Sequence, residues 1–440
     1  MEMNAAGEWW SPDEPDTRWA GTLRVDDDGA SHLTLIDRSA LRSLSAPSPT
    51  HSILHGITDD GKRVSLHDCF DISSSTTSLG LGRRVIHARF ALVGFHSGGA
   101  DPLVSGASAA FGGSRRWYGR ANLKVESFTS MRSVRLAYDA EPEVVLFDEQ
   151  GLLLKMYSTL TSVSYGFDDE GTYSLKENLR FELEASPERP LSKLNRVLVA
   201  CKDLLSIATQ SFTAVEQWWA YQGTGEKAQV ATFHARPVFR DRDSSRHPRE
   251  MLFRYQDVAD APARYFSRWL KEADRLASIR GLYFSAVYGD HFVQGRFVNL
   301  TQALEAFHRR YRSAAPAGLN PQRLARFERS YSLEQRLKDL FHEHRWALEA
   351  VVTRPAELIP EIVSRRRRFT HFPVEENDGV DERHDWLGFN ALLRFLLELC
   401  FLKVAGFMDD ELAGLAGRNW QRGRMIRKFL CREGATSESR

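Results

Sequence analysis

The 440-residue sequence contains few cysteines. Four are present, widely spaced and with no Cys-x-x-Cys pair among them: Cys69, Cys201, Cys400 and Cys431. Disulfide scaffolds and zinc modules both need cysteines that are dense and regularly spaced. The scarcity therefore argues against both classes, and it favours the reducing cytoplasm as the location of the protein.

The sequence also lacks a long apolar run and an excess of charge of either sign. Its most apolar stretch, residues 392–407, is interrupted by Arg394, Glu398 and Lys403, which indicates a core helix rather than a membrane span. The first ten residues, MEMNAAGEWW, show neither the basic nor the apolar segment of a signal peptide. Lysine and arginine number 59 against 58 acidic residues, so any nucleic-acid site must be local.

Motifs of several common catalytic sites are missing. His342 and His344 flank Glu343, but no His-Glu-x-x-His pattern and no Gly-x-Ser-x-Gly elbow occurs. The glycine-rich stretch Gly94–Gly113 is not followed by Gly-Lys-Ser/Thr. We therefore predict that this stretch is a long loop rather than a phosphate loop, and we expect neither a metal nor a cofactor.

Residues 1–190 are predicted to form a β-rich domain. Short apolar runs alternate there with turn-forming clusters of Gly, Asp and Ser, a spacing typical of a β-sandwich or a barrel. Asp59–Lys62 between two such runs predicts a hairpin, and Trp9-Trp10 is most simply core or edge packing. The predicted strands are Thr22–Val25, His32–Leu35, Ser52–Ile57, Val64–Leu66, His87–Val93, Glu143–Phe147 and Leu179–Leu183.

The pattern changes near Ser186–Pro190, where two prolines fall close together. Residues 191–295 are predicted to form a mixed bridging region, either separate or part of the N-terminal domain, with helices at 191–208 and 261–280 and strands at 214–221 and 228–239. Residues 296–435 are almost entirely helical in pattern and predict an up-and-down bundle. Its helices are Asn299–Arg312, Ser332–Val352, Pro355–Arg368, Trp386–Phe407 and Asp409–Phe429. The chain is thus expected to be an α+β multidomain protein.

The stretch most informative about chemistry is Ser364–Pro373, SRRRRFTHFP, at the end of a predicted helix. Pro373 blocks helical continuation, so the helix should end at about His371. If the last turn loosens there, His371 can swing back towards Arg366, which lies five positions earlier. A histidine that titrates near neutrality can transfer protons, and an arginine can stabilise negative charge on a phosphoryl group during cleavage of RNA.

An arginine, four to six residues and then a histidine at the end of a bundle helix resembles the motif of HEPN ribonucleases. Here the motif is Arg366, four intervening residues and His371. More narrowly, the tail resembles the HEPN domain of ApeA-like anti-phage proteins, through Asn299–Glu305 and Ser332–Leu337 and the apolar helix ending Ala405-Gly406. The front resembles their N-terminal domain, through Gly7-Glu8-Trp9-Trp10, His55-Gly56, Leu92-Val93-Gly94 and Arg116-Trp117.

The resemblance implies a homodimer or a higher oligomer in which two Arg/His sets face one another and cut RNA without a metal. Arg366 and His371 would be catalytic, and the products would carry a 2′,3′-cyclic phosphate and a 5′-hydroxyl. The residue after the arginine is often Asn in the family, whereas Arg367 stands here. The resemblance further implies abortive infection, with a phage product as the trigger of the N-terminal domain and tRNA as a plausible substrate.

Neighbouring residues allow a functional and a structural interpretation. Arg365, Arg367 and Arg368 are candidate RNA contacts, yet a run of charge is commonly a solvated helix face. Thr370 is a candidate phosphate contact, or its hydroxyl bonds back to its own helix. Glu305 is a candidate for orienting a group of the site or for pairing with an arginine, and a structural salt bridge is the favoured interpretation. Two other charged segments are more simply solvated: the basic run from Arg422 to Arg432, with Trp420 and Phe429 interleaved, and the acidic loop Glu375–Asp385.

Two other functions stay open on the sequence. The bundle could be a non-catalytic HEPN-type module that binds RNA or protein, although both motif residues are present. It could also be an interaction protein whose basic run docks on an acidic partner, an association that salt would weaken.

Overall fold

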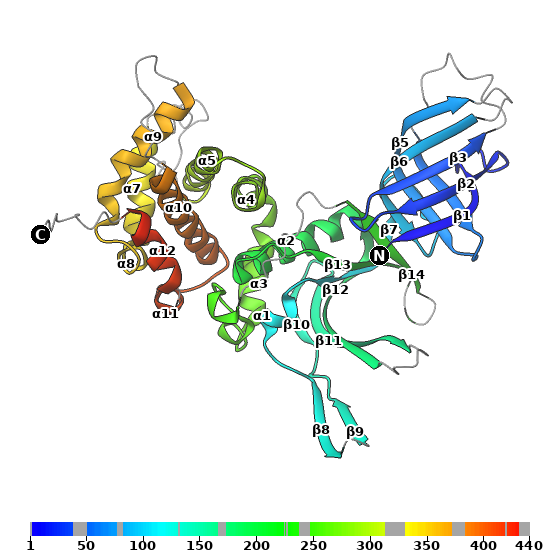
Figure 1. The fold of residues 1–440 in the computed structure, drawn as a ribbon, viewed down its shortest axis with the longest axis horizontal. Coiled ribbons are helices and arrows are strands. Elements are labelled where there is room, and N and C mark those ends of the chain that lie inside the picture. Colours follow the sequence, from blue (N-terminus) through cyan, green and yellow to red (C-terminus); the bar gives the residue numbers. More distant parts are fainter. Residues whose placement is uncertain are drawn as a thin grey trace, which may run out of the picture. The chain divides into compact units, whose positions relative to one another are not determined.

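A computed structural model describes residues 2–37, 51–76, 82–130, 133–165, 173–223, 225, 228–236, 247–312, 331–371, 383–418 and 420–430. The chain divides into two compact units (Figure 1). Unit 1 comprises Met1–Arg115, Arg120–Lys202 and Thr213–Asp241, and unit 2 comprises Arg116–Gly119, Asp203–Phe212 and Arg242–Arg440. The division of the sequence at residues 190 and 295 stays a prediction.

Six strands of unit 1 close into a barrel. They pair in the order β6-β3-β2-β1-β4-β5, and a further pairing of β5 with β6 completes the ring. The strands are β1 Met3–Trp10, β2 Arg18–Val25, β3 Ser31–Asp37, β4 His51–Thr58, β5 Arg63–Thr76 and β6 Gly82–Val93. The structure confirms the β-rich front and the hairpin at 59–62, and it selects a barrel over a sandwich.

The barrel core follows from the alternation of side chains along each strand. Leu23 and Val25 point inward from β2, and the fully buried Trp9 sits among them with its indole N–H donating to the carbonyl of Gly21 at 3.2 Å. Gly56 lies against the Trp9 ring, where an added Cβ would come within 2.3 Å of it. The Trp9-Trp10 pair is therefore packing, as the sequence indicated.

The sheet continues beyond the barrel in the order β10-β11-β12-β7-β13-β14-β6. These strands are β7 Leu103–Phe111, β10 Val144–Glu149, β11 Leu152–Tyr165, β12 Tyr173–Pro190, β13 Val215–Gln222 and β14 Gln229–Ala235, and a separate hairpin joins β8 Leu123–Ser130 to β9 Ser133–Tyr138. The strand predicted at 214–221 is confirmed, and the one predicted at 228–239 is confirmed over Gln229–Ala235, with residues 237–239 lying outside the described residues. The long loop predicted at Gly94–Gly113 is wrong for β7, whose small residues are buried between two neighbouring strands.

Helix α2, Leu191–Thr209, begins directly after β12 and confirms the helix predicted at 191–208. Short helix α1, Ser114–Tyr118, precedes β8. Both helices contribute residues to each unit: α2 belongs to unit 1 as far as Lys202 and to unit 2 from Asp203.

Unit 2 is helical (Figure 1). Its helices are α3 Pro262–Lys271, α4 Ala273–Tyr288, α5 Val293–Tyr311, α7 Leu333–Glu343, α8 Arg345–Glu349, α9 Ile359–His371, α10 Arg383–Val404, α11 Asp409–Arg418 and α12 Trp420–Leu430. Three predicted helices are each divided in two: 261–280 at Glu272, 332–352 at His344, and 409–429 between Arg418 and Trp420. The 3₁₀ turn Pro355–Leu358 similarly precedes α9.

Helix α10 forms the centre of unit 2, packing against α5 and α12. Its Glu398 is completely buried, accepts a hydrogen bond from the Tyr283 hydroxyl at 2.6 Å and pairs with Arg394 at 2.7 Å. Burial raises the pKa of Tyr283 well above its ordinary value, so this hydroxyl keeps its proton. Within the described ranges, no helix has the length and apolar character needed to cross a bilayer.

Candidate functional site

Helix α9 carries the arginine run and presents it on two faces. Ile359 and Ile362 are fully buried and fix the inner face of the helix, and Arg365 follows one turn later on the same face. Arg366 is half-buried, whereas Arg367 and Arg368 are exposed. The four consecutive arginines are therefore not equivalent.

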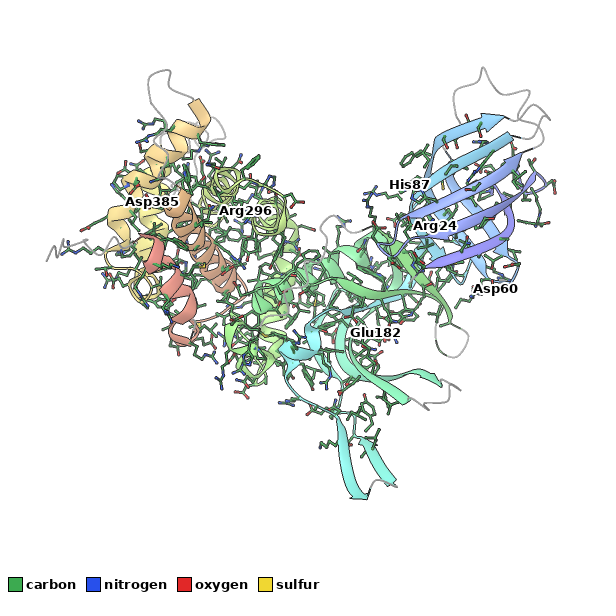
Figure 2. The ribbon with its side chains drawn as sticks, viewed as in Figure 1. Arg24, Asp60, His87, Glu182, Arg296 and Asp385 are labelled. Atoms are coloured by element: carbon green, nitrogen blue, oxygen red, sulfur yellow. The ribbon has the colours of Figure 1, made fainter. Side chains whose placement is uncertain are left out.

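Arg365 is buried against helix α10, with 7% of its surface exposed. Its guanidinium donates to Glu361 at 2.7 Å and to Asp385 at 3.3 Å (Asp385 is labelled in Figure 2). The same group lies over the rings of Trp386 and Phe389, at 4.9 and 5.0 Å from the ring centroids. This arrangement favours a role for Arg365 in holding α9 against α10 over direct contact with RNA.

We expect Arg365→Ala to lower the free energy of unfolding by about 2 kcal/mol, because it removes the charge-assisted hydrogen bonds to Glu361 and Asp385 and the cation–π contacts with two rings of α10. Arg368→Ala, at an exposed position of the same helix, should change it by less than about 0.5 kcal/mol. Urea unfolding of the two full-length variants makes the comparison. Equal stabilities would contradict the role of Arg365 as the link between the two helices.

The backbone of α9 is helical as far as His371. The side chains of Thr370 and His371 lie outside the described residues, as does Pro373. At about 100° and 1.5 Å per residue, the Cα atoms of Arg366 and His371 are about 140° apart around the axis and about 7.5 Å apart along it. The loosening expected in the last turn is not seen in the backbone, so a phosphate shared by this pair would lie across the end of the helix.

Arg366 and Arg367 line a pocket of about 280 Å³ between three helices of unit 2. Helix α5 contributes Glu305, and the first turn of α7 contributes three adjacent residues. The complete lining is Glu305, Ser332, Leu333, Glu334, Val363, Arg366 and Arg367. The pocket therefore combines two guanidinium groups with two carboxylates and a small apolar surface.

The acidic residues of this pocket are held by cations of their own helices. Glu305 pairs with Arg309 at 2.6 Å, as the sequence suggested, and Glu334 pairs with Lys338 at 2.6 Å. Ser332 begins α7 as its N-cap, accepting from the backbone N–H of Gln335 at 3.2 Å. Sequence reasoning found Glu305 but did not place it beside Arg366, and it missed Glu334 as part of the site.

A polar cluster of the buried His308 and Arg336 with the exposed Asp339 fixes α5 against α7 next to the pocket. His308 pairs through Nε2 with Asp339 at 2.8 Å, and its Nδ1 lies 3.2 Å from a guanidinium nitrogen of the buried Arg336. Burial lowers the pKa of His308, which favours a neutral ring that accepts from Arg336 and donates to Asp339. The cluster thereby sets the spacing between the helices that carry Glu305 and Glu334.

The pocket lining includes no described side chain from the basic face of α12. Arg424 and Lys428 are exposed, and Arg427 donates to the carbonyl of Ala350 at 3.2 Å. The side chains of Trp420 and Arg422, and all of Arg432, lie outside the described residues. Residues 375–382 of the predicted acidic loop Glu375–Asp385 lie outside the described residues. Asp385 is described, and it pairs with Arg365.

Among the side chains that the structure describes, no three His, Cys, Asp or Glu residues gather as a metal site. Comparison with protein families gives two matches. Residues 4–269 match the family described as ApeA N-terminal domain 1, and residues 298–411, which include Arg366 and His371, match Apea-like HEPN. No curated protein and no solved structure matches the chain.

Proposed function

The chain belongs to the ApeA-like family, and from this premise we propose that its HEPN domain is a metal-independent endoribonuclease. The observation that carries the proposal is the position of Arg366, which lines a pocket of unit 2 five residues before His371 at the end of α9. A permanent cation and a titratable ring at the same helix end suit the cleavage of a phosphodiester.

In the proposed reaction, the 2′-hydroxyl of one nucleotide loses its proton and its oxygen attacks the adjacent phosphorus. The bond to the 5′-oxygen breaks, and that oxygen takes up a proton. His371 transfers the protons, and the guanidinium of Arg366 stabilises the extra negative charge on the phosphoryl oxygens. The products are a 2′,3′-cyclic phosphate and a 5′-hydroxyl end.

The working enzyme, in this proposal, is a homodimer or a larger homo-oligomer joined through the HEPN bundle. A second copy brings its own Arg/His set to the same cleft. Arg366 and His371 lie on different sides of the same helix. In a dimer each phosphate can contact groups from both chains, so one chain need not supply both groups to the same phosphate.

The proposal extends to the biology that the family implies. The N-terminal region senses a phage product in the cytoplasm and thereby releases the nuclease, which stops translation by cutting RNA, with tRNA as the proposed substrate. Thr370, Arg367 and Arg368 are proposed RNA contacts near the end of α9, and the exposure of both arginines supports this role.

We expect the purified chain to cut tRNA at the same rate with and without EDTA, because the proposed chemistry uses no metal. The new ends should be substrates for a ligase that joins cyclic-phosphate to 5′-hydroxyl ends. Loss of cutting on chelation, or 5′-phosphate ends, would contradict the mechanism. RNA that is bound but left intact would favour the alternative, a HEPN-type module that binds without catalysis.

A further inference from the structure

The pocket beside Arg366 has a lining that suits a whole nucleotide rather than a phosphate alone. Two guanidinium groups, from Arg366 and Arg367, can hold anionic oxygens. Leu333 and Val363 offer apolar surface to the face of a ring. Its volume, about 280 Å³, is at the small end of ligand pockets, which matches one base with its ribose or phosphate.

The carboxylates of Glu305 and Glu334 decide which base the pocket fits. An ionised carboxylate only accepts hydrogen bonds, and its two oxygens match a pair of adjacent N–H donors. The Watson–Crick edge of guanine offers such a pair, its ring N1–H and its 2-amino group. Adenine and cytosine each present an acceptor nitrogen beside their amino group, and uracil has a single donor, so these bases match less well.

Neighbouring contacts hold the two carboxylates in place. Each is paired with a cation one turn along its own helix, Arg309 for Glu305 and Lys338 for Glu334. The hydrogen bond between the buried ring of His308 and the exposed carboxylate of Asp339 joins the two helices. The acceptors are therefore positioned before RNA arrives, which lowers the entropy cost of binding.

We propose that this pocket is a base-binding subsite that takes a guanine of single-stranded RNA beside the phosphate held by Arg366, with Glu305 and Glu334 accepting from its Watson–Crick edge. The inference rests on the proposed function, because it places RNA at Arg366. It adds that cleavage occurs next to guanine, so that the two carboxylates determine the sequence preference of the enzyme.

The test measures binding in a chain that does not cut. The full-length His371→Ala variant is titrated with labelled oligouridine that carries one central guanosine, adenosine or inosine, since inosine lacks the 2-amino group. We expect guanosine to bind about tenfold more tightly than adenosine, with inosine between them. Adding Glu305→Gln or Glu334→Gln should reduce this preference several-fold, whereas Glu357→Gln, an exposed change outside the pocket, should leave it intact.

The outcomes separate the subsite from the nuclease proposal. The subsite is wrong if guanosine has no advantage, or if its advantage survives both glutamine changes. If the chain with His371 intact cuts no RNA while the guanosine preference depends on the carboxylates, the nuclease proposal fails and the subsite stands. Because both glutamates pair with surface cations, Arg309 and Lys338, their replacement should leave the melting temperature close to that of the parent chain.

Discussion

Replacing Arg366 or His371 with alanine should abolish the cleavage of RNA while the helical unit stays folded. Loss of a proton-transfer group lowers a rate constant by roughly 10²–10⁴, and loss of a donor that stabilises a developing anion lowers it by roughly 10²–10³. Both variants should also cease to be toxic when the chain is triggered in cells. The measurement is single-turnover cleavage of labelled tRNA by the purified full-length chain.

Two matched controls make the result specific. Arg345→Ala and His342→Ala change the same residue types at exposed positions of the same unit, away from the pocket lining. Both should cut at the rate of the parent chain. A nuclease that keeps its full rate after either change at Arg366 or His371, with melting temperatures unchanged, would refute the assignment of that residue.

The largest loss of stability is expected from Glu398→Ala. Glu398 is fully buried on α10, where it holds Arg394 and accepts from Tyr283. Its removal leaves the part-buried guanidinium of Arg394 without its carboxylate and the buried Tyr283 hydroxyl without its acceptor, and breaking a buried pair of this kind costs about 3–5 kcal/mol. Urea unfolding followed by circular dichroism at a helix-sensitive wavelength measures the change.

Glu349→Ala serves as the control for this experiment, since Glu349 is an exposed glutamate at the end of α8. It should alter the free energy of unfolding by less than about 0.5 kcal/mol. A cost below 1 kcal/mol for Glu398→Ala would show that the pair contributes little to the stability of unit 2.

Much of the fold is predictable from the sequence where the signal is local. Alternating apolar residues and turn clusters located most of the barrel strands, and α2, α5 and α10 followed from helical periodicity. The closure of the barrel through β5 and β6 is a long-range pairing that no local pattern encodes. Strand β7 was missed because its run of Gly, Ala and Ser has low β-propensity and is held by its neighbours.

The same limit applies to the candidate site. The spacing of Arg366 and His371 can be read from the sequence, and the proline at position 373 predicts the end of the helix at about His371. That Arg365 is buried depends on Trp386 and Phe389, which another helix brings to it. The meeting of Glu305, Glu334 and Arg366 depends on three helices at once, and hydrophobic periodicity contains no information about it.

The anchoring of Arg365 against α10 has a consequence for which insertions and deletions α9 can tolerate. The four consecutive arginines have identical side chains, and they differ only in the direction in which each projects from the helix axis. Deleting one residue ahead of the run would rotate every guanidinium by about 100°, so a different arginine would fall against Trp386 and another would enter the pocket. Both positions would therefore keep an arginine, whereas His371 would turn away by the same angle with no second histidine to replace it. The length of α9 is thus constrained by its histidine rather than by its arginines.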